Sequence, residues 1–209
     1  LVPDNAIIYN LLGEAYKNQG NIAQAIISYE SSIAFDPNTA GVHFNLGVAY
    51  SIQENFLLAI HSLHMAIMLQ PDYAAAYYQL GSVNNKQGAY IQAVQSYEKA
   101  IDLQPDYAVA YNNLGVAFKN LDNYHMAIES YNKALELKPK HAEAHYNLGN
   151  AYQHQDNNSL AIHYYEKAIK FNPNYTIAYN NLGVIYRKRG KYNKAIQVYK
   201  RAIDIEPNN

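Results

Sequence analysis

Five side-chain amides recur along the chain at one fixed interval. A carboxamide carries both a hydrogen-bond donor and an acceptor, so it can pair with the N–H and the C=O of a peptide group. Because Asn is not favoured inside helices, helix propensity does not explain the series. We therefore expect these five residues to bind the main chain of a partner: Asn45, Gln79, Asn113, Asn147 and Asn181.

The position before each amide belongs to the same candidate site. It holds Phe44, Tyr78, Asn112, Tyr146 and Asn180. We expect the three aromatic residues of this set to add apolar contact area and some selectivity. One alternative stays open at this point, because the amides could instead form hydrogen bonds within the helix layer.

Residue types that are typical of catalysis or metal binding form no recognisable group. The chain has no Cys, which excludes disulfides, thiolate zinc sites and cysteine nucleophiles. His61 with His64 and His141 with His145 have helical spacing, but no third metal ligand is indicated. No phosphate-binding loop and no nucleophile motif occurs. We therefore expect a protein that is not an enzyme and that has no cofactor and no metal site.

One fixed period organises the whole chain. The seven prolines, from Pro3 to Pro207, are evenly spaced, and Gly and Ala recur at the same interval. Such a period indicates tandem structural units. We predict one continuous domain of six repeats that follows the tail of a preceding repeat at 1–5. The repeats are 6–39, 40–73, 74–107, 108–141, 142–175 and 176–209.

Each repeat predicts two helices. The first follows Pro-Asp or Pro-Asn, so that a residue such as Asp72 is expected to cap it. This helix contains a Gly, such as Gly115, which costs about 1 kcal/mol relative to Ala in mid-helix. Its recurrence predicts that the second helix packs too closely there for a side chain. The second helix has an aromatic residue such as Tyr131 between alanines, and Pro ends the repeat.

This pattern resembles the tetratricopeptide repeat (TPR) family in all six repeats. The resemblance implies an all-α fold, a right-handed superhelical solenoid of six 34-residue helix-turn-helix repeats. It also implies that the candidate residues point into a concave groove. The sequence departs from the family at the preferred Trp of the first helix, which Tyr or His replaces. Asn84 also stands where the other repeats have Tyr or Phe.

The amide row is similar to the one in the repeat domain of protein O-linked N-acetylglucosamine transferases. In those enzymes Asn amides hold the main chain of a substrate, although Leu11 and Gln79 depart from that row here. The resemblance implies a non-catalytic scaffold that holds an extended protein or peptide segment in the groove. Two alternatives remain open: the substrate-recognition segment of a larger glycosyltransferase of this kind, and a structural module that self-associates through uncovered terminal repeats.

Charge and hydropathy indicate whether nucleic acid or a membrane could be a partner of the chain. A net charge of −1 argues against nucleic acid, and no apolar run approaches the ~20 residues that cross a membrane. The beginning of the chain lacks a signal-peptide pattern, so we expect a cytoplasmic location. The last repeat carries seven basic and two acidic residues. This excess predicts either a solvated face or a docking patch for an acidic segment, including the acidic N-terminal half of a second copy.

Overall fold

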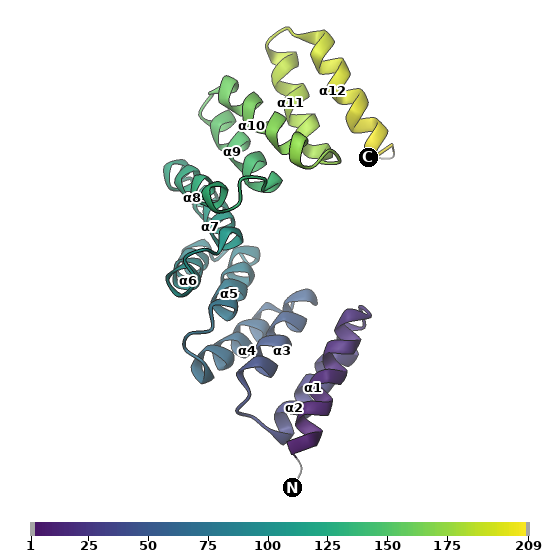
Figure 1. Ribbon diagram of the computed structural model, residues 1–209, viewed down its shortest axis with the longest axis vertical. Coiled ribbons are helices and arrows are strands. Elements are labelled where there is room, and N and C mark those ends of the chain that lie inside the picture. Colours follow the sequence, from purple (N-terminus) through teal and green to yellow (C-terminus); the bar gives the residue numbers. More distant parts are fainter. Residues whose placement is uncertain (1–2, 208–209) are drawn as a thin grey trace. The chain divides into compact units, whose positions relative to one another are not determined.

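The computed structural model describes residues 3–207, which form twelve α-helices and no strand (Figure 1). The all-α repeat fold predicted from the sequence is thereby confirmed. The helices are α1 (Pro3–Asn18), α2 (Ile22–Phe35), α3 (Ala40–Ile52), α4 (Phe56–Leu69), α5 (Ala74–Lys86), α6 (Tyr90–Leu103), α7 (Ala108–Asn120), α8 (Tyr124–Leu137), α9 (Ala142–His154), α10 (Asn158–Phe171), α11 (Thr176–Lys188) and α12 (Tyr192–Ile205).

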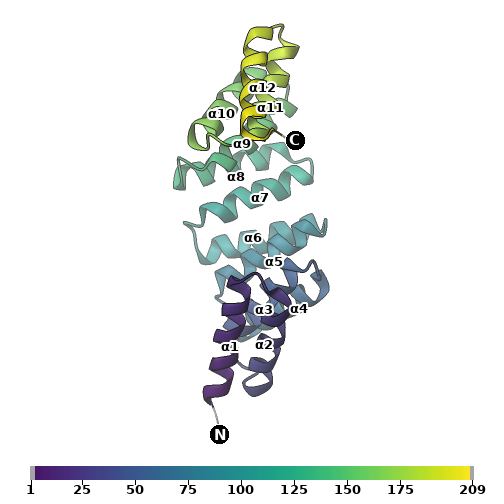
Figure 2. The same cartoon turned by 90° about the vertical axis from the view of Figure 1, so that its right-hand side faces the viewer.

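The chain divides into two compact units, and the boundary falls between Pro105 and Asp106. Unit 1 contains α1 to α6, and unit 2 contains α7 to α12. In each unit an odd-numbered helix packs against the even-numbered helix that follows it, as α7 and α8 do in Figure 2. The even-numbered helix also packs against the next odd-numbered helix of its unit. Each unit is therefore a stack of three helix pairs.

The turn between the two helices of each repeat contains a residue with positive φ. Gly20, Gly88 and Gly190 have φ between 70° and 82°. At the equivalent positions Glu54, Asp122 and Asp156 have φ between 56° and 58°. Side chains disfavour this left-handed region, which explains why Gly recurs in the turns.

The prediction that Asp72 caps the following helix is wrong. The N-cap of α5 is the next residue, Tyr73, and no side-chain hydrogen bond caps this helix. Asp72 instead accepts a hydrogen bond from the Ala74 N–H with its backbone carbonyl. Side-chain caps do occur elsewhere, where Asn123, Asn157 and His141 accept from a backbone N–H in the first turn of α8, α10 and α9. The Pro-Asp turn thus places one more residue before the helix than the sequence indicates.

Helix α1 begins at an earlier position of its repeat than the first helices of the other repeats do. Helix α1 begins at Pro3, where proline is well tolerated because the first helical N–H has no partner within the helix. Residues 3–5 are therefore helical, where we expected the tail of a preceding repeat. Residues 1 and 2 of that predicted tail lie outside the described residues.

Close packing of the two helices explains the recurrent glycine. A Cβ added to Gly115 would lie 2.5 Å from the ring of Tyr131, and one added to Gly149 would lie 2.6 Å from the ring of Tyr165. Gly47 faces Leu63 in the same way, at 2.8 Å. Such distances are shorter than any ordinary carbon contact, so a side chain would force the helices apart. The predicted reason for the mid-helix glycine is confirmed.

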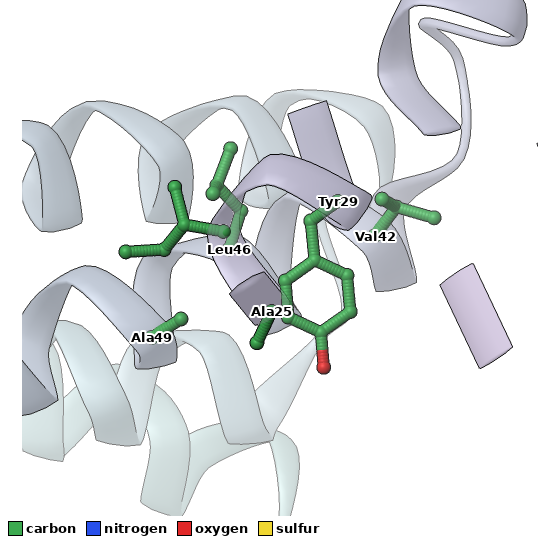
Figure 3. Packing of buried hydrophobic residues seen from close by; sticks show 6 residues of the cluster. Ala25, Tyr29, Val42, Leu46 and Ala49 are labelled. Atoms are coloured by element: carbon green, nitrogen blue, oxygen red, sulfur yellow. The ribbon is translucent and has the colours of Figure 1, made fainter. Parts of the chain in front are cut away.

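The core consists of small and aromatic residues that interlock between helices. In Figure 3, Ala25 and Tyr29 of α2 lie together with Val42, Leu46 and Ala49 of α3. Tyr29, Ala25 and Ala49 have no exposed surface. The aromatic residue of a second helix thus packs both under the glycine of its own repeat and against the first helix of the next.

Candidate functional site

All ten predicted site residues lie on first helices of the repeats. We call the surface formed by these helices the inner face, which comprises α1, α3 and α5 in unit 1 and α7, α9 and α11 in unit 2. Asn180 is exposed, and Asn112 and Asn147 are buried. The other seven are half-buried, namely Phe44, Asn45, Tyr78, Gln79, Asn113, Tyr146 and Asn181.

In unit 1, Asn45 connects α3 to α1. Its amide nitrogen donates to Asn10 Oδ1 at 3.3 Å and to Glu14 Oε1 at 3.2 Å. Its amide oxygen lies 3.5 Å from Lys17 Nζ, which donates to it. This amide therefore joins a small charged network, with a carboxylate and an ammonium group on either side.

In unit 2, Asn147 connects α9 to α7. Its amide nitrogen donates to Asn112 Oδ1 at 3.0 Å, and the Asn112 amide nitrogen donates to Glu143 Oε1 at 3.2 Å and to Asn113 Oδ1 at 3.3 Å. Asn112 has no exposed surface. The prediction that Asn112 contacts a partner therefore does not fit the structure, because both ends of this amide are used inside the helix layer.

Asn181 forms the third connection, from α11 to α9. Its amide nitrogen lies 3.0 Å from Asn150 Oδ1, 3.4 Å from the Tyr146 hydroxyl and 3.5 Å from the Tyr165 hydroxyl. The Tyr165 hydroxyl lies 2.7 Å from Asn150 Oδ1 and 2.6 Å from Gln153 Oε1. Burial raises the pKa of Tyr165, so its hydroxyl stays neutral and can donate.

The three connecting amides share one direction. The amide nitrogens of Asn45, Asn147 and Asn181 all donate to the preceding repeat, to residues 31 or 35 positions earlier in the chain. The alternative of bonding within the helix layer is therefore confirmed for these nitrogens. Among the described groups, no donor contacts the amide oxygen of Asn147 or Asn181. These oxygens are the part of the row that has hydrogen-bonding capacity for a partner.

Aromatic pairs lie beside the amides. The rings of Phe44 and Tyr73 are 5.1 Å apart, and those of Tyr146 and Tyr175 are 5.0 Å apart. Burial raises the pKa of Tyr175 to about 12, with a further contribution from the charge of Glu143. Sequence reasoning missed Tyr73 and Tyr175, although Tyr recurs directly before first helices. Each ring pair makes a larger apolar surface than its predicted member alone.

The histidine pairs have other partners. His145 Nε2 lies 3.0 Å from the carbonyl oxygen of Pro139, and His141 Nδ1 accepts from the Ala144 N–H at 3.2 Å. Within the part of the chain that the structure describes, no three His, Asp or Glu residues gather around a common point for a metal ion. In the same part, no helix has the length and apolar character that crossing a membrane requires.

Comparison with known families gives matches over most of the chain. The family described as "Tetratricopeptide repeat" matches residues 108–141, 142–175 and 176–209. A second one, described as "TPR repeat", matches residues 17–53 and 82–122. The chain belongs to the tetratricopeptide repeat family. A comparison with curated protein sequences gives no match.

Solved structures include several that are similar to this chain. MamA is 31% identical with a TM-score of 0.71, and the match covers 77% of this chain and 94% of MamA. YrrB, described as "a TPR protein with an unusual peptide-binding site", is 23% identical with a TM-score of 0.66 and coverages of 87% and 93%. PilF of Pseudomonas aeruginosa has a TM-score of 0.84 at 19% identity, with coverages of 99% and 94%. The last two show the shared fold alone.

Proposed function

We propose that this chain is a non-catalytic TPR scaffold that holds an extended segment of a partner protein on its inner face. The observation that carries the proposal is the common direction of the three connecting amides. Because their nitrogens are fixed by the preceding repeat, the amide oxygens of Asn147 and Asn181, which no described donor contacts, are held at the same position in two consecutive repeats. A row of fixed acceptors suits the backbone N–H groups of an extended chain.

The spacing of the repeats is compatible with such a partner. Packed helices lie ~10 Å apart, and an extended chain advances ~3.3 Å per residue. One amide per repeat would therefore meet about every third residue of the partner. Each hydrogen bond contributes about 1 kcal/mol, so several repeats have to act together.

The aromatic pairs supply the apolar part of the surface. The pairs Phe44 with Tyr73 and Tyr146 with Tyr175 lie next to the connecting amides. They favour partners with large apolar side chains at intervals, whereas main-chain contacts at the amides tolerate many sequences. YrrB, whose description names a peptide-binding site, supports a peptide as the ligand class for this fold.

A second candidate function rests on the same row. Amides that hold the main chain of a substrate also suit the substrate-recognition segment of a larger glycosyltransferase. This function uses the inner face in the same way, so the experiment below applies to both. The candidates differ in whether the full-length protein transfers a sugar to the bound segment.

Selected peptides and three variants test the proposal. A library of displayed 12-residue peptides is selected on the chain, and the affinity of the enriched peptides is measured by fluorescence anisotropy. We expect the pair N147L and N181L, combined in one protein, to weaken binding at least tenfold, because both acceptor oxygens are lost. The pair N147D and N181D keeps acceptor oxygens but loses the nitrogens that fix their direction, and it is expected to lose less affinity than the Leu pair.

The control is N193L, on the exposed part of α12 away from the inner face. It should leave peptide binding unchanged, and far-ultraviolet circular dichroism should show full helicity for all variants. Equal binding by the Leu pair and the parent would contradict the proposal. So would equal losses in the Leu and Asp pairs, because the acceptor oxygens would then not matter.

A further inference from the structure

A cavity of about 320 Å³ opens between α10, α11 and α12, on the side formed by the second helices. Its apolar floor includes Ile169, Leu182 and Val198, and its polar rim includes Glu166, Lys194 and Arg201. We call it the α12 cavity. None of the ten predicted inner-face residues lines it.

The preceding repeat has different side chains at two of the positions that line the cavity. Tyr164, the equivalent of Val198 in that repeat, stacks on Tyr152 with ring centres 5.4 Å apart. It packs there against a core cluster that contains Leu135 and Leu148, which are the equivalents of Ile169 and Leu182. Leu160 is likewise the equivalent of Lys194. The valine and the lysine thus leave open a space that Tyr164 fills one repeat earlier.

The rim of the cavity is mainly positive. The Lys194 ammonium lies 5.5 Å from the ring centre of Tyr186, and the Tyr186 hydroxyl donates to Glu166 Oε1 at 2.9 Å. Arg201 forms only an exposed contact with Asp204, at 3.6 Å. Such an exposed pair contributes little, so Arg201 stays available to a second carboxylate.

The end of α11 and the turn that leads into α12 add four more cations. Arg187, Lys188, Arg189 and Lys191 are all exposed. Among the described residues, none of the four forms an ion pair with an acidic side chain. Charges of one sign that lack internal partners attract segments of the opposite sign, and they speed association with them.

We propose that the α12 cavity takes one large apolar side chain from an acidic protein segment, whose carboxylates contact Lys194 and Arg201 at the rim and the cations at the end of α11 and in the turn after it. The size of the cavity suits a single aromatic or aliphatic side chain, and its apolar floor provides the matching surface. The cations supply orientation and association rate. This surface is independent of the inner face, so the chain can hold two segments at once.

A protein segment fits this surface better than a nucleic acid does. The apolar floor of Ile169, Leu182 and Val198 offers no partner to a phosphate backbone, whereas it matches an apolar side chain of a peptide. The occupant that we commit to is therefore an acidic peptide with one large apolar residue.

Peptide display with counter-selection tests the proposal. Displayed 12-residue peptides are selected on the chain, and those that also bind the V198Y variant are removed. Tyr in place of Val198 is expected to fill the cavity as Tyr164 does one repeat earlier, while the inner face is unchanged. We expect enrichment of peptides with several Asp or Glu around one large apolar residue. No enrichment, or enriched peptides that are not acidic, would overturn the proposal.

Two charge variants on α12 provide the matched comparison. K194E places a carboxylate on the rim of the cavity, and K200E makes the same change on the same helix outside it. We expect K194E to weaken the enriched peptides at least tenfold and K200E by less than threefold, in titrations at constant salt. Equal effects of the two variants would show general charge attraction and would overturn a specific cavity. Binding of RNA or DNA oligonucleotides alone, without any bound peptide, would also overturn the proposal.

Discussion

Tyr131 of α8 and Tyr165 of α10 occupy the same position in consecutive repeats, but their hydroxyl groups have different surroundings. Both rings are fully buried under a glycine of the first helix. The Tyr165 hydroxyl has hydrogen-bonding partners in Asn150 and Gln153. The buried Tyr131 hydroxyl has no partner among the described residues. A shared packing position therefore does not guarantee a shared polar environment.

The residue directly after the glycine is one difference between the two repeats. Asn150 follows Gly149 and reaches the Tyr165 hydroxyl, whereas Val116 follows Gly115 and offers Tyr131 no acceptor. Tyr29 in unit 1 resembles Tyr131, because no described group bonds to its buried hydroxyl either. Burial and the nearby charge of Glu14 raise the pKa of Tyr29 to about 12. Because Glu14 follows Gly13 and Tyr29 still has no partner, an acceptor after the glycine is not sufficient, and Asn150 and Gln153 together hold the Tyr165 hydroxyl.

The largest effect is expected from N150V, which removes from Tyr165 the acceptor that Tyr131 also lacks. The variant takes one hydrogen bond from Tyr165 and one from Asn181, and each contributes about 1 kcal/mol. We expect the free energy of unfolding to fall by about 2 kcal/mol, measured by urea unfolding followed by circular dichroism. A loss smaller than that of one ordinary hydrogen bond, about 0.5 kcal/mol at the least, would show that the network adds little.

The next largest effect is expected when the hydroxyl group is removed from each of the two tyrosines in turn. Y165F takes a partner away from the network, and we expect it to lower the free energy of unfolding by about 1 kcal/mol. Y131F removes a hydroxyl that has no partner in the described structure. The same urea measurement should therefore show an unchanged or slightly higher free energy of unfolding. Similar losses in the two variants would mean that Tyr131 has a partner in solution, and the comparison would then fail.

The converse change, V116N, should supply the missing acceptor. An amide at this position is expected to reach the Tyr131 hydroxyl, as Asn150 reaches that of Tyr165. We expect the free energy of unfolding to rise by about 0.5–1 kcal/mol, and we expect no such rise in the V116N/Y131F double variant. An equal rise in both proteins would assign the effect to the helix itself and not to the hydroxyl.

The smallest effect concerns His145, whose Nδ1 is a third buried polar atom without a partner among the described residues. Burial lowers the pKa of His145, with smaller contributions from Lys167, His163 and His141. The folded state therefore disfavours the proton, so stability is complete above the unfolded pKa of about 6.5 and falls as the pH drops below it.

The slope should be a fraction of the ~1.4 kcal/mol per pH unit that one whole proton gives. Urea unfolding at several pH values between 7.5 and 5 measures it. The variant H145Y carries the residue that the first, third, fourth and sixth repeats have at this position, and it should reduce the slope. An unchanged slope in H145Y would place the titrating group elsewhere, with His141 as the first candidate.

The sequence predicts the packing of this chain better than its polar contacts. Gly115 and Tyr131 recur in register, and the constant repeat length is sufficient to predict that one packs under the other. The direction of Asn181 depends on Asn150, which lies 31 residues earlier, so it becomes evident only when neighbouring repeats are compared for polar pairs.

Two features of the surface were harder to predict for related reasons. The candidate site included Asn112, which is buried, because the sequence alone does not show that Asn147 and Glu143 enclose it. The α12 cavity lies where this repeat has Val198 and the preceding repeat has Tyr164, and that difference becomes evident only when the two repeats are compared. The predicted helix cap was wrong because the turn before the helix is one residue longer than the sequence indicates. A different side chain therefore stands at the N-cap.

Backbone N-methylation of a bound peptide tests the central claim most directly. A peptide selected on the inner face is synthesised in versions that each carry one N-methyl group, which removes a single N–H donor and leaves the side chain in place. Acceptor oxygens in successive repeats predict that binding falls about tenfold at every third position and changes little between them. A uniform response along the peptide, or none, would contradict the proposal that the inner face holds the main chain of its partner.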